Sequence, residues 1–148
     1  MKKITIYTDG GSRGNPGPAG AGIVFCNEEG KIFKKYSYYL GDKLTNNEAE
    51  YLAIIFALKN FKKFFGVKIA KVSTVCLKSD SQLIVKQMKG EYKVKNPEIQ
   101  KLFLEVWNLR TDFQDVKFRF IKREKNQEAD ALVNEALDNQ QKTNNKLL

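Results

Sequence analysis

The most constraining feature of this sequence is a glycine-rich segment that directly follows a short alternating stretch. Ile4, Ile6 and Thr8 alternate with their neighbours and lead into Asp9, a pattern that predicts a β-strand. Residues 10–22 then hold six glycines and two prolines, so we expect a tight loop there. The chain therefore presents a carboxylate at the end of its first strand, next to backbone that side chains do not shield.

The rest of the chain alternates strands with helices. Four further strands are predicted, over residues 21–27, 31–40, 72–78 and 116–121. Four helices are predicted, over residues 46–65, 81–88, 97–108 and 126–137. This order predicts an α/β domain that begins with an antiparallel meander.

Two of the helix starts carry specific signals. Thr45 and Glu48 fit a capping box, and Pro97 suits the first turn of a helix.

The length of 148 residues suits one domain, and no repeat or linker divides it, so we place the domain at residues 1–138. Residues 139–148 are polar and are expected to form a disordered tail.

Histidine is absent from the chain, which removes several classes of active site. Without an imidazole there is no Ser-His-Asp or Cys-His nucleophile and no histidine-ligated zinc. Cys26 and Cys76 lie in apolar stretches and make no C-x-x-C pair, so the sequence supports neither a disulfide scaffold nor a zinc knuckle. Any catalysis must use carboxylates, lysines, hydroxyls or a bound metal.

The charge of the chain is basic and unevenly spread. The formal net charge is +9, and residues 51–100 hold ten basic residues against three acidic ones. This suggests a polyanionic partner, either nucleic acid or an anionic membrane surface, while lysines that only keep the chain soluble explain the charge equally well. The first residues lack the apolar core that a signal peptide needs, so we expect no export signal, and no run reaches the roughly 18 apolar residues of a membrane span. With free cysteines, we expect a cytoplasmic protein with no membrane partner.

Four carboxylates stand at the ends of predicted elements. Asp9 ends the first strand and Asp80 follows the fourth, so both lie at one sheet edge if these strands are parallel neighbours. Glu50 and Asp130 lie in the first turns of two helices, where the helix dipole favours negative charge. Four carboxylates in one place need cations between them. With no histidine or paired cysteine, the matching cations are Mg²⁺ or Mn²⁺.

Four local motifs contain these carboxylates. They are TDGGSRGNPG at residues 8–17, TNNEAE at 45–50, SDSQ at 79–82 and NQEADAL at 126–132. In this order, and spread over essentially the whole domain, they resemble the ribonuclease H family, type I. The resemblance implies a ribonuclease H-like α/β fold, with a five-stranded mixed β-sheet flanked by α-helices.

The resemblance also implies a reaction. The expected protein is a hydrolase, an endonuclease that cuts the RNA strand of RNA–DNA hybrids and leaves 5′-phosphate and 3′-hydroxyl ends. Two divalent ions, Mg²⁺ or Mn²⁺, roughly 3.5–4 Å apart would activate water and stabilise the leaving oxygen. By motif, the metal-binding catalytic set is Asp9, Glu50, Asp80 and Asp130. Glu50 is preferred to Glu48 because it stands three residues after the second asparagine of Thr-Asn-Asn, and because Glu48 serves as a cap.

A set of substrate-binding residues follows from the same resemblance. The glycine-rich loop, the asparagines and Gln82 are expected to contact the hybrid, including the RNA 2′-hydroxyls that distinguish RNA from DNA, and Thr45 a DNA phosphate. Lysines near the middle of the chain would bind phosphates, with helix capping and a solvated face as the alternatives for the asparagines and the lysines. The full set is Gly10, Gly11, Ser12, Arg13, Asn15, Thr45, Asn46, Asn47, Ser81, Gln82, Lys86 and Lys89, with Lys93 and Lys95 beside Tyr92 as further candidates.

The chain departs from the family pattern in two places. Some members carry a histidine just before the last helix, and Arg123 is the best candidate for that place here. Arginine does not shuttle protons at neutral pH, so we expect Arg123 to hold the scissile phosphate or its product. A basic handle helix is also missing, because only about eight residues separate Met88 from Pro97. Weaker hybrid affinity with a steep salt dependence is therefore expected.

Other classes of protein remain as alternatives. A related nuclease could also cleave double-stranded RNA, and a binding module on the same fold could be catalytically weak. Two further interpretations are that the chain is the nuclease domain of a reverse transcriptase, or that it is a basic structural protein with no active site. The expected partner is an RNA–DNA hybrid, bound by a monomer.

Overall fold

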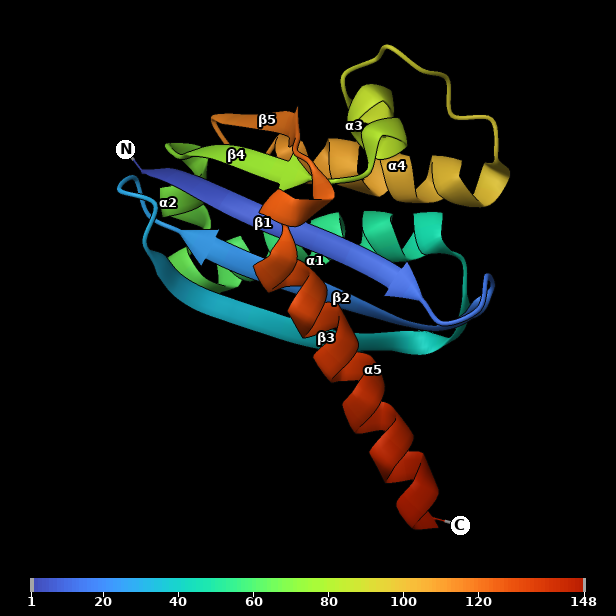
Figure 1. Cartoon of the computed structure of the whole chain (residues 1–148). Coiled ribbons are helices and arrows are strands. Elements are labelled where there is room, and N and C mark those ends of the chain that lie inside the picture. The colour runs from blue at the N-terminus through green and yellow to red at the C-terminus, as the bar shows by residue number, and fades with distance from the viewer. Residues whose placement is uncertain (1, 148) are drawn as a thin grey trace.

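The structure, a computed structural model, describes residues 2–147 and places five strands in one mixed sheet (Figure 1). The sheet order is β3-β2-β1-β4-β5. The strands are β1 (Lys3–Ser12), β2 (Gly17–Cys26), β3 (Ile32–Leu44), β4 (Thr74–Ser79) and β5 (Asp115–Phe120). The helices are α1 (Asn46–Phe65), α2 (Val67–Lys71), α3 (Gln82–Met88), α4 (Pro97–Arg110), the short 3₁₀ turn η1 (Arg123–Lys125) and α5 (Gln127–Leu147).

The pairing of the strands confirms the predicted fold class. β1, β2 and β3 form an antiparallel meander, while β1 pairs with β4 and β4 with β5 in parallel. The parallel pairs need crossover connections, which the helices between these strands supply. The predicted elements are therefore present in the predicted order.

Helices cover the two faces of the sheet unequally. α1 packs on β1 and β2 and α4 packs on α1, so the main core lies on this face. It includes Ile6, Tyr51, Leu58 and Leu77, each no more than 1% exposed. α5 crosses the opposite face over β1, β2 and β3, where a smaller cluster contains Val24 and Ala129 (Figure 1).

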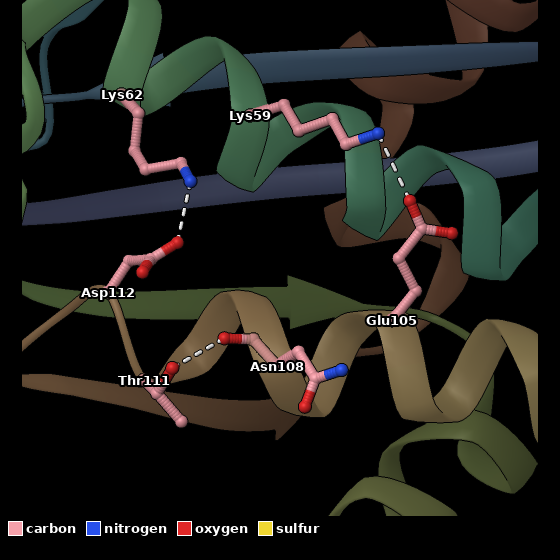
Figure 2. Close-up of polar contacts among 6 residues, drawn as sticks. All are labelled: Lys59, Lys62, Glu105, Asn108, Thr111 and Asp112. Carbon is pink, nitrogen blue, oxygen red and sulfur yellow. Dashed lines mark hydrogen bonds and ion pairs between the residues drawn. The ribbon is translucent and has the colours of Figure 1, made fainter.

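Polar contacts fix α4 against α1 (Figure 2). Lys59 lies 3.0 Å from a carboxylate oxygen of Glu105, and Lys62 lies 2.5 Å from one of Asp112. At the end of α4, the Thr111 hydroxyl donates to the Asn108 carbonyl. Such partly exposed ion pairs contribute modestly to stability, so they orient α4 more than they hold it.

The glycine-rich segment differs from its prediction as a loop over residues 10–22. β1 continues to Ser12 and β2 begins at Gly17, so only residues 13–16 connect the two strands. The reason is close packing of helices on the sheet. A Cβ on Gly10 would lie 2.2 Å from the Ala49 carbonyl oxygen, and one on Gly22 would lie 2.0 Å from that of Ala129. These glycines therefore serve helix–sheet contact within strands rather than a turn.

The C-terminal segment also differs from its prediction as a disordered tail. α5 continues through residues 139–147 instead of ending near Asp138. Arg13 forms an ion pair of 2.7 Å with Asp138, and Gln140 and Asn144 help to line a cavity with Tyr39 of β3. The end of α5 is therefore packed near the connection between β1 and β2 and near β3. None of the described helices is long and apolar enough to cross a bilayer.

Candidate active site

Parallel pairing of β1 and β4 brings the first two carboxylates together. The register runs from Lys3 opposite Thr74 to Tyr7 opposite Lys78. Continued by two residues, it places Asp9 opposite Asp80, which confirms the expectation that they share a sheet edge. Asp9 is 7% exposed, and its carboxylate accepts a hydrogen bond from the Gly10 N–H.

Close approach of two helices adds the other two carboxylates. Gly10 lets the start of α1 touch β1, and this packing places the buried Glu50 next to Asp9. Gly22, the partner of Asp9 in β2, lets the start of α5 touch the sheet, and Asp130 lies in that first turn. All four carboxylates line one pocket of about 420 Å³.

Three of the carboxylates form a compact group. Asp9, Glu50 and Asp80 each offer an oxygen, and these oxygens all lie within 4.8 Å of one another. Burial and the neighbouring Asp80 carboxylate raise the pKa of Asp9 from 3.8 to about 7. Burial, with Asp9 as the next cause, raises the pKa of Glu50 well above its ordinary value. Burial also raises the pKa of Asp80, against an opposing hydrogen bond from Asn126.

The group has the properties of a divalent cation site. Glu50 Oε2 is buried and has no hydrogen-bond partner among the described residues. A buried carboxylate oxygen without a partner is costly unless a proton or a cation satisfies it. Because all donors here are carboxylate oxygens, the residues fit a hard divalent ion rather than zinc or copper.

The capping signals of α1 separate Glu48 from Glu50, as the sequence predicts. The Thr45 hydroxyl accepts from the Glu48 N–H, and the Glu48 carboxylate accepts from the Thr45 N–H. Glu48 is therefore occupied at the helix start, while Glu50 points to Asp9 and Asp80.

The loop residues and asparagines assemble beside the carboxylates. The Asn46 side-chain oxygen accepts from the N–H and the hydroxyl of Ser12, and the Asn46 N–H donates to the Asn15 side chain. These bonds tie the connection between β1 and β2 to the start of α1. The predicted residues that line the carboxylate pocket are Gly10, Gly11, Ser12, Arg13, Asn46, Asn47, Ser81 and Arg123.

A second, larger cavity adjoins this pocket through shared asparagines. Its volume is about 710 Å³, and Asn46 and Asn47 line both spaces. Asn15, Thr45, Lys93 and Lys95 line only the larger cavity. The site thus continues from the carboxylates along the start of α1 to the linker that precedes α4.

Three predicted substrate residues line neither space. Gln82 is exposed at the start of α3. The Lys86 ammonium lies over the Tyr92 ring, 4.9 Å from its centre, and Lys89 lines a separate groove beside β5. The structure therefore does not bring these side chains to the carboxylate pocket.

Asn126 is a site residue that sequence reasoning missed. Its side-chain amide donates to the Thr8 carbonyl at 2.9 Å and to Asp80 Oδ2 at 3.4 Å. It is 1% exposed, and its carbonyl accepts from the Asp130 N–H at the start of α5. Asn126 thus connects three of the elements that carry carboxylates. In the sequence it resembles an ordinary helix-start residue.

Known proteins resemble this chain in sequence. The family model described as "Reverse transcriptase-like" matches residues 7–136. Ribonuclease HI of Halobacterium salinarum is 38% identical over 92% of this chain and 65% of its own length. The bifunctional protein Rv2228c of Mycobacterium tuberculosis is 37% identical over 92% of this chain and 36% of its own length. This chain thus spans about a third of the mycobacterial relatives.

Solved structures agree with the sequence relatives. LC11-RNase H1, crystallised in complex with an RNA/DNA hybrid, superposes with a TM-score of 0.86 at 45% identity, over 92% of this chain and 97% of that one. RNase H1 from Halobacterium salinarum gives a TM-score of 0.85 at 36% identity, over 93% and 98% of the two chains. Together with the motifs and the carboxylate site, these matches identify the chain as a member of the reverse transcriptase-like, ribonuclease H family.

Proposed function

We propose that this chain is a metal-dependent endoribonuclease that hydrolyses the RNA strand of RNA–DNA hybrids and leaves 5′-phosphate and 3′-hydroxyl ends. The observation that carries the proposal is the group formed by Asp9, Glu50 and Asp80, with the buried oxygen of Glu50 unsatisfied. A site that holds several carboxylates this close is suited to cations that in turn attract a phosphodiester. The resemblance of the chain to hybrid-binding RNase H1 supports the substrate.

Asp9, Glu50, Asp80 and Asp130 would hold two divalent ions. When bound, such ions supply a nucleophile from water at neutral pH and stabilise the leaving oxygen. Asn126 orients the Asp80 carboxylate through its hydrogen bond. Arg123 lines the pocket, and its charge offsets part of the rise that burial causes in the pKa of Asp80, so it would present a fixed positive charge to the scissile phosphate.

The residues beside the carboxylates would distinguish the RNA strand from DNA. Asn46 and Asn47 line both cavities, which supports a contact with a strand that lies across the scissile position. Amide side chains can both donate to and accept from a 2′-hydroxyl, which DNA lacks. Thr45, Lys93 and Lys95 would then contact the complementary DNA strand in the larger cavity.

Three finer points belong to the same proposal. We assign Mg²⁺ or Mn²⁺ as the ion, because the donor set contains only oxygen. We assign a reducing, intracellular compartment, since Cys26 and Cys76 are both free thiols. We assign a monomer, because every proposed site residue comes from one chain.

Cleavage of an end-labelled RNA–DNA hybrid tests the proposal. Wild type, Asp9→Asn and Asp80→Asn are compared with Mg²⁺, with Mn²⁺ and with a chelator. We expect cutting of the hybrid RNA strand only with a divalent ion, and a loss of about 10³-fold or more in each variant. Glu48→Gln is the matched control, because Glu48 caps α1 and should keep most of the activity.

Duplex RNA and duplex DNA serve as substrate controls. Equal cutting of double-stranded RNA would keep the metal site but contradict the hybrid preference. Binding of the hybrid without cutting in either metal would contradict the enzyme and favour a binding module.

A further inference from the structure

Residues 89–96, which join α3 to α4, form neither helix nor strand, yet they carry two of the lysines proposed to contact the hybrid (Figure 1). Lys93 and Lys95 are both exposed, and both line the larger cavity. An irregular segment loses conformational entropy when it is ordered, and each long lysine side chain adds to that loss. The firmness with which the backbone is held at these lysines therefore decides how much of their attraction for phosphate appears as affinity.

The second half of this segment is attached to α4 and to the core. Val94, between the two lysines, is half-buried and packs against the main core. Its carbonyl accepts a hydrogen bond of 2.9 Å from the side chain of Gln100. The Asn96 side chain accepts from the N–H groups of Glu98 and Ile99 and so caps α4. This half of the segment has defined contacts on both sides.

The first half is held by a buried amide near the end of α3. Gln87 is 8% exposed. Its Nε2 donates to the Lys93 carbonyl at 3.2 Å, and its Oε1 accepts from the Tyr51 hydroxyl at 2.7 Å. A backbone carbonyl can only accept, so the NH₂ end of the amide must face Lys93 and the oxygen must face Tyr51. The two bonds thus fix the orientation of the Gln87 side chain.

Tyr51 gives this connection a rigid base. Its side chain is 0% exposed, lies in the main core and comes from α1, directly after Glu50. Burial raises the pKa of its hydroxyl, which therefore stays protonated and able to donate at neutral pH. A hydroxyl and an amide buried this deeply are costly unless they are paired, and here each satisfies the other. Contacts therefore run from the helix that carries Glu50 to the backbone of the lysine segment.

From these contacts we infer that Tyr51 and Gln87 are positioning residues for hybrid binding. They fix the backbone at Lys93, so that this lysine and Lys95 meet the hybrid already ordered and lose less freedom on binding. The inference rests on the proposed function for the identity of the bound hybrid. Tyr51 and Gln87 act through the lysines and not by contact with the hybrid. One buried amide would in this way order two cations where other family members use a handle helix.

Three single substitutions test the inference. Gln87→Met keeps a long unbranched side chain and removes both hydrogen bonds, and Tyr51→Phe removes only the hydroxyl. Tyr38→Phe is the matched control. It also removes one tyrosine hydroxyl with a partner on α1, the Asn60 side chain at 2.8 Å, and Tyr38 does not line the larger cavity. Circular dichroism checks that each variant is folded under the assay conditions.

The first measurement separates KM from kcat for cleavage of the hybrid. We expect KM to rise roughly threefold to tenfold in Gln87→Met and Tyr51→Phe, which is the cost of ordering one or two side chains on binding. The kcat should stay within about twofold of wild type, because the carboxylates are untouched. The control should keep both values. A fall in kcat without a rise in KM, or an equal rise in KM in the control, would overturn the inference.

A double-mutant cycle shows whether Gln87 acts through the lysines. Affinity for a labelled hybrid is measured by fluorescence anisotropy in Asp80→Asn, with and without Lys93→Gln plus Lys95→Gln. We expect Gln87→Met to weaken binding roughly threefold to tenfold when the lysines are present and less than about twofold when they are absent. A full effect without the lysines would assign Gln87 a direct contact or a purely structural role and would overturn the inference. So would a lysine variant that binds as tightly as its parent.

Hydrogen exchange tests the ordered backbone without any substrate. Amide exchange over residues 91–96, followed by mass spectrometry, should accelerate about tenfold or more in Gln87→Met and Tyr51→Phe but not in Tyr38→Phe. Unchanged exchange in the first two variants would overturn the inference. A failure of wild type to cut any hybrid would contradict the proposed function alone, because neither exchange nor anisotropy depends on cleavage.

Discussion

Asp9 shows a conflict between folding and function at the scale of single residues. The pKa of its carboxyl is about 7 in the folded chain against an ordinary value of 3.8, so the folded state binds this proton more tightly than the unfolded state. The stabilisation linked to this proton is fully present below pH 3.8 and is lost as the pH rises to about 7.

The metal-free protein should therefore unfold more easily at pH 8 than at pH 5. Asp9→Asn removes the charge, so at pH 8 we expect it to be more stable than wild type by about 1–3 kcal/mol in a chelator. Thermal unfolding at both pH values measures this. Added Mg²⁺ should restore wild type and leave the variant unchanged, and a variant less stable than wild type at pH 8 would contradict the argument.

Asn126 illustrates what residue-level reasoning from sequence lacks. The four carboxylates stand out because their charge marks them, whereas an uncharged amide at a helix start reads as an ordinary capping residue. Its role depends on Thr8 of β1 and on Asp80, which directly follows β4. Contacts between residues so distant in sequence become visible only in three dimensions.

Replacement of this amide should weaken the metal site. We expect Asn126→Ala to lower metal affinity about 10-fold to 100-fold, because Asp80 loses its orienting donor. Calorimetric titration with Mn²⁺ measures the affinity, and excess metal should recover part of the activity. Asn108→Ala is the matched control, since Asn108 is exposed on α4 and does not line the carboxylate pocket, and an equal loss there would argue against the specific role.

At the scale of elements, the order of strands and helices was predictable from the sequence, but the packing role of the glycines was not. Periodic apolar residues and the capping box of α1 are local signals, and the structure confirms them. Gly10 and Gly22 are read locally as turn residues, yet both lie within paired strands. Their purpose is set by α1 and α5, which no local window includes. Helix α2 was missed for a related reason, because five residues are too few to show a period.

Substitution of these glycines should separate the helices from the sheet. Gly10→Ala and Gly22→Ala each place a methyl group against a helix carbonyl, so we expect a loss of about 3 kcal/mol or more in stability. Urea unfolding measures the loss. In Gly11→Ala the nearest atom is 3.8 Å away, so its unfolding midpoint should stay close to wild type. Similar losses in all three would show a general intolerance of side chains instead.

At the scale of the whole molecule, charge and fold together predict how the chain meets its substrate. The net charge is +9, and the middle of the chain supplies most of it. Both the sign and the location were predictable from composition. Which lysines face the site was not, since Lys93 and Lys95 line the larger cavity while Lys86 and Lys89 lie elsewhere.

Binding of the hybrid should depend steeply on salt. Because lysines supply the proposed phosphate contacts, we expect affinity to fall roughly 10²–10³-fold between about 50 and 200 mM salt. Titration of a labelled hybrid with Asp80→Asn, which should bind without cutting, measures the slope. A flat plot of log K against log salt would contradict a phosphate-dominated contact.

The unsatisfied oxygen of Glu50 has a practical consequence for anyone who evolves this protein in the laboratory. A library screened for heat resistance in a chelating buffer will enrich neutral replacements at Asp9 and Glu50, because these relieve repulsion in the empty protein. The variants enriched by such a screen would be more stable but catalytically inactive. The same library screened with divalent ion present would reject them, so the buffer alone decides whether directed evolution preserves the enzyme.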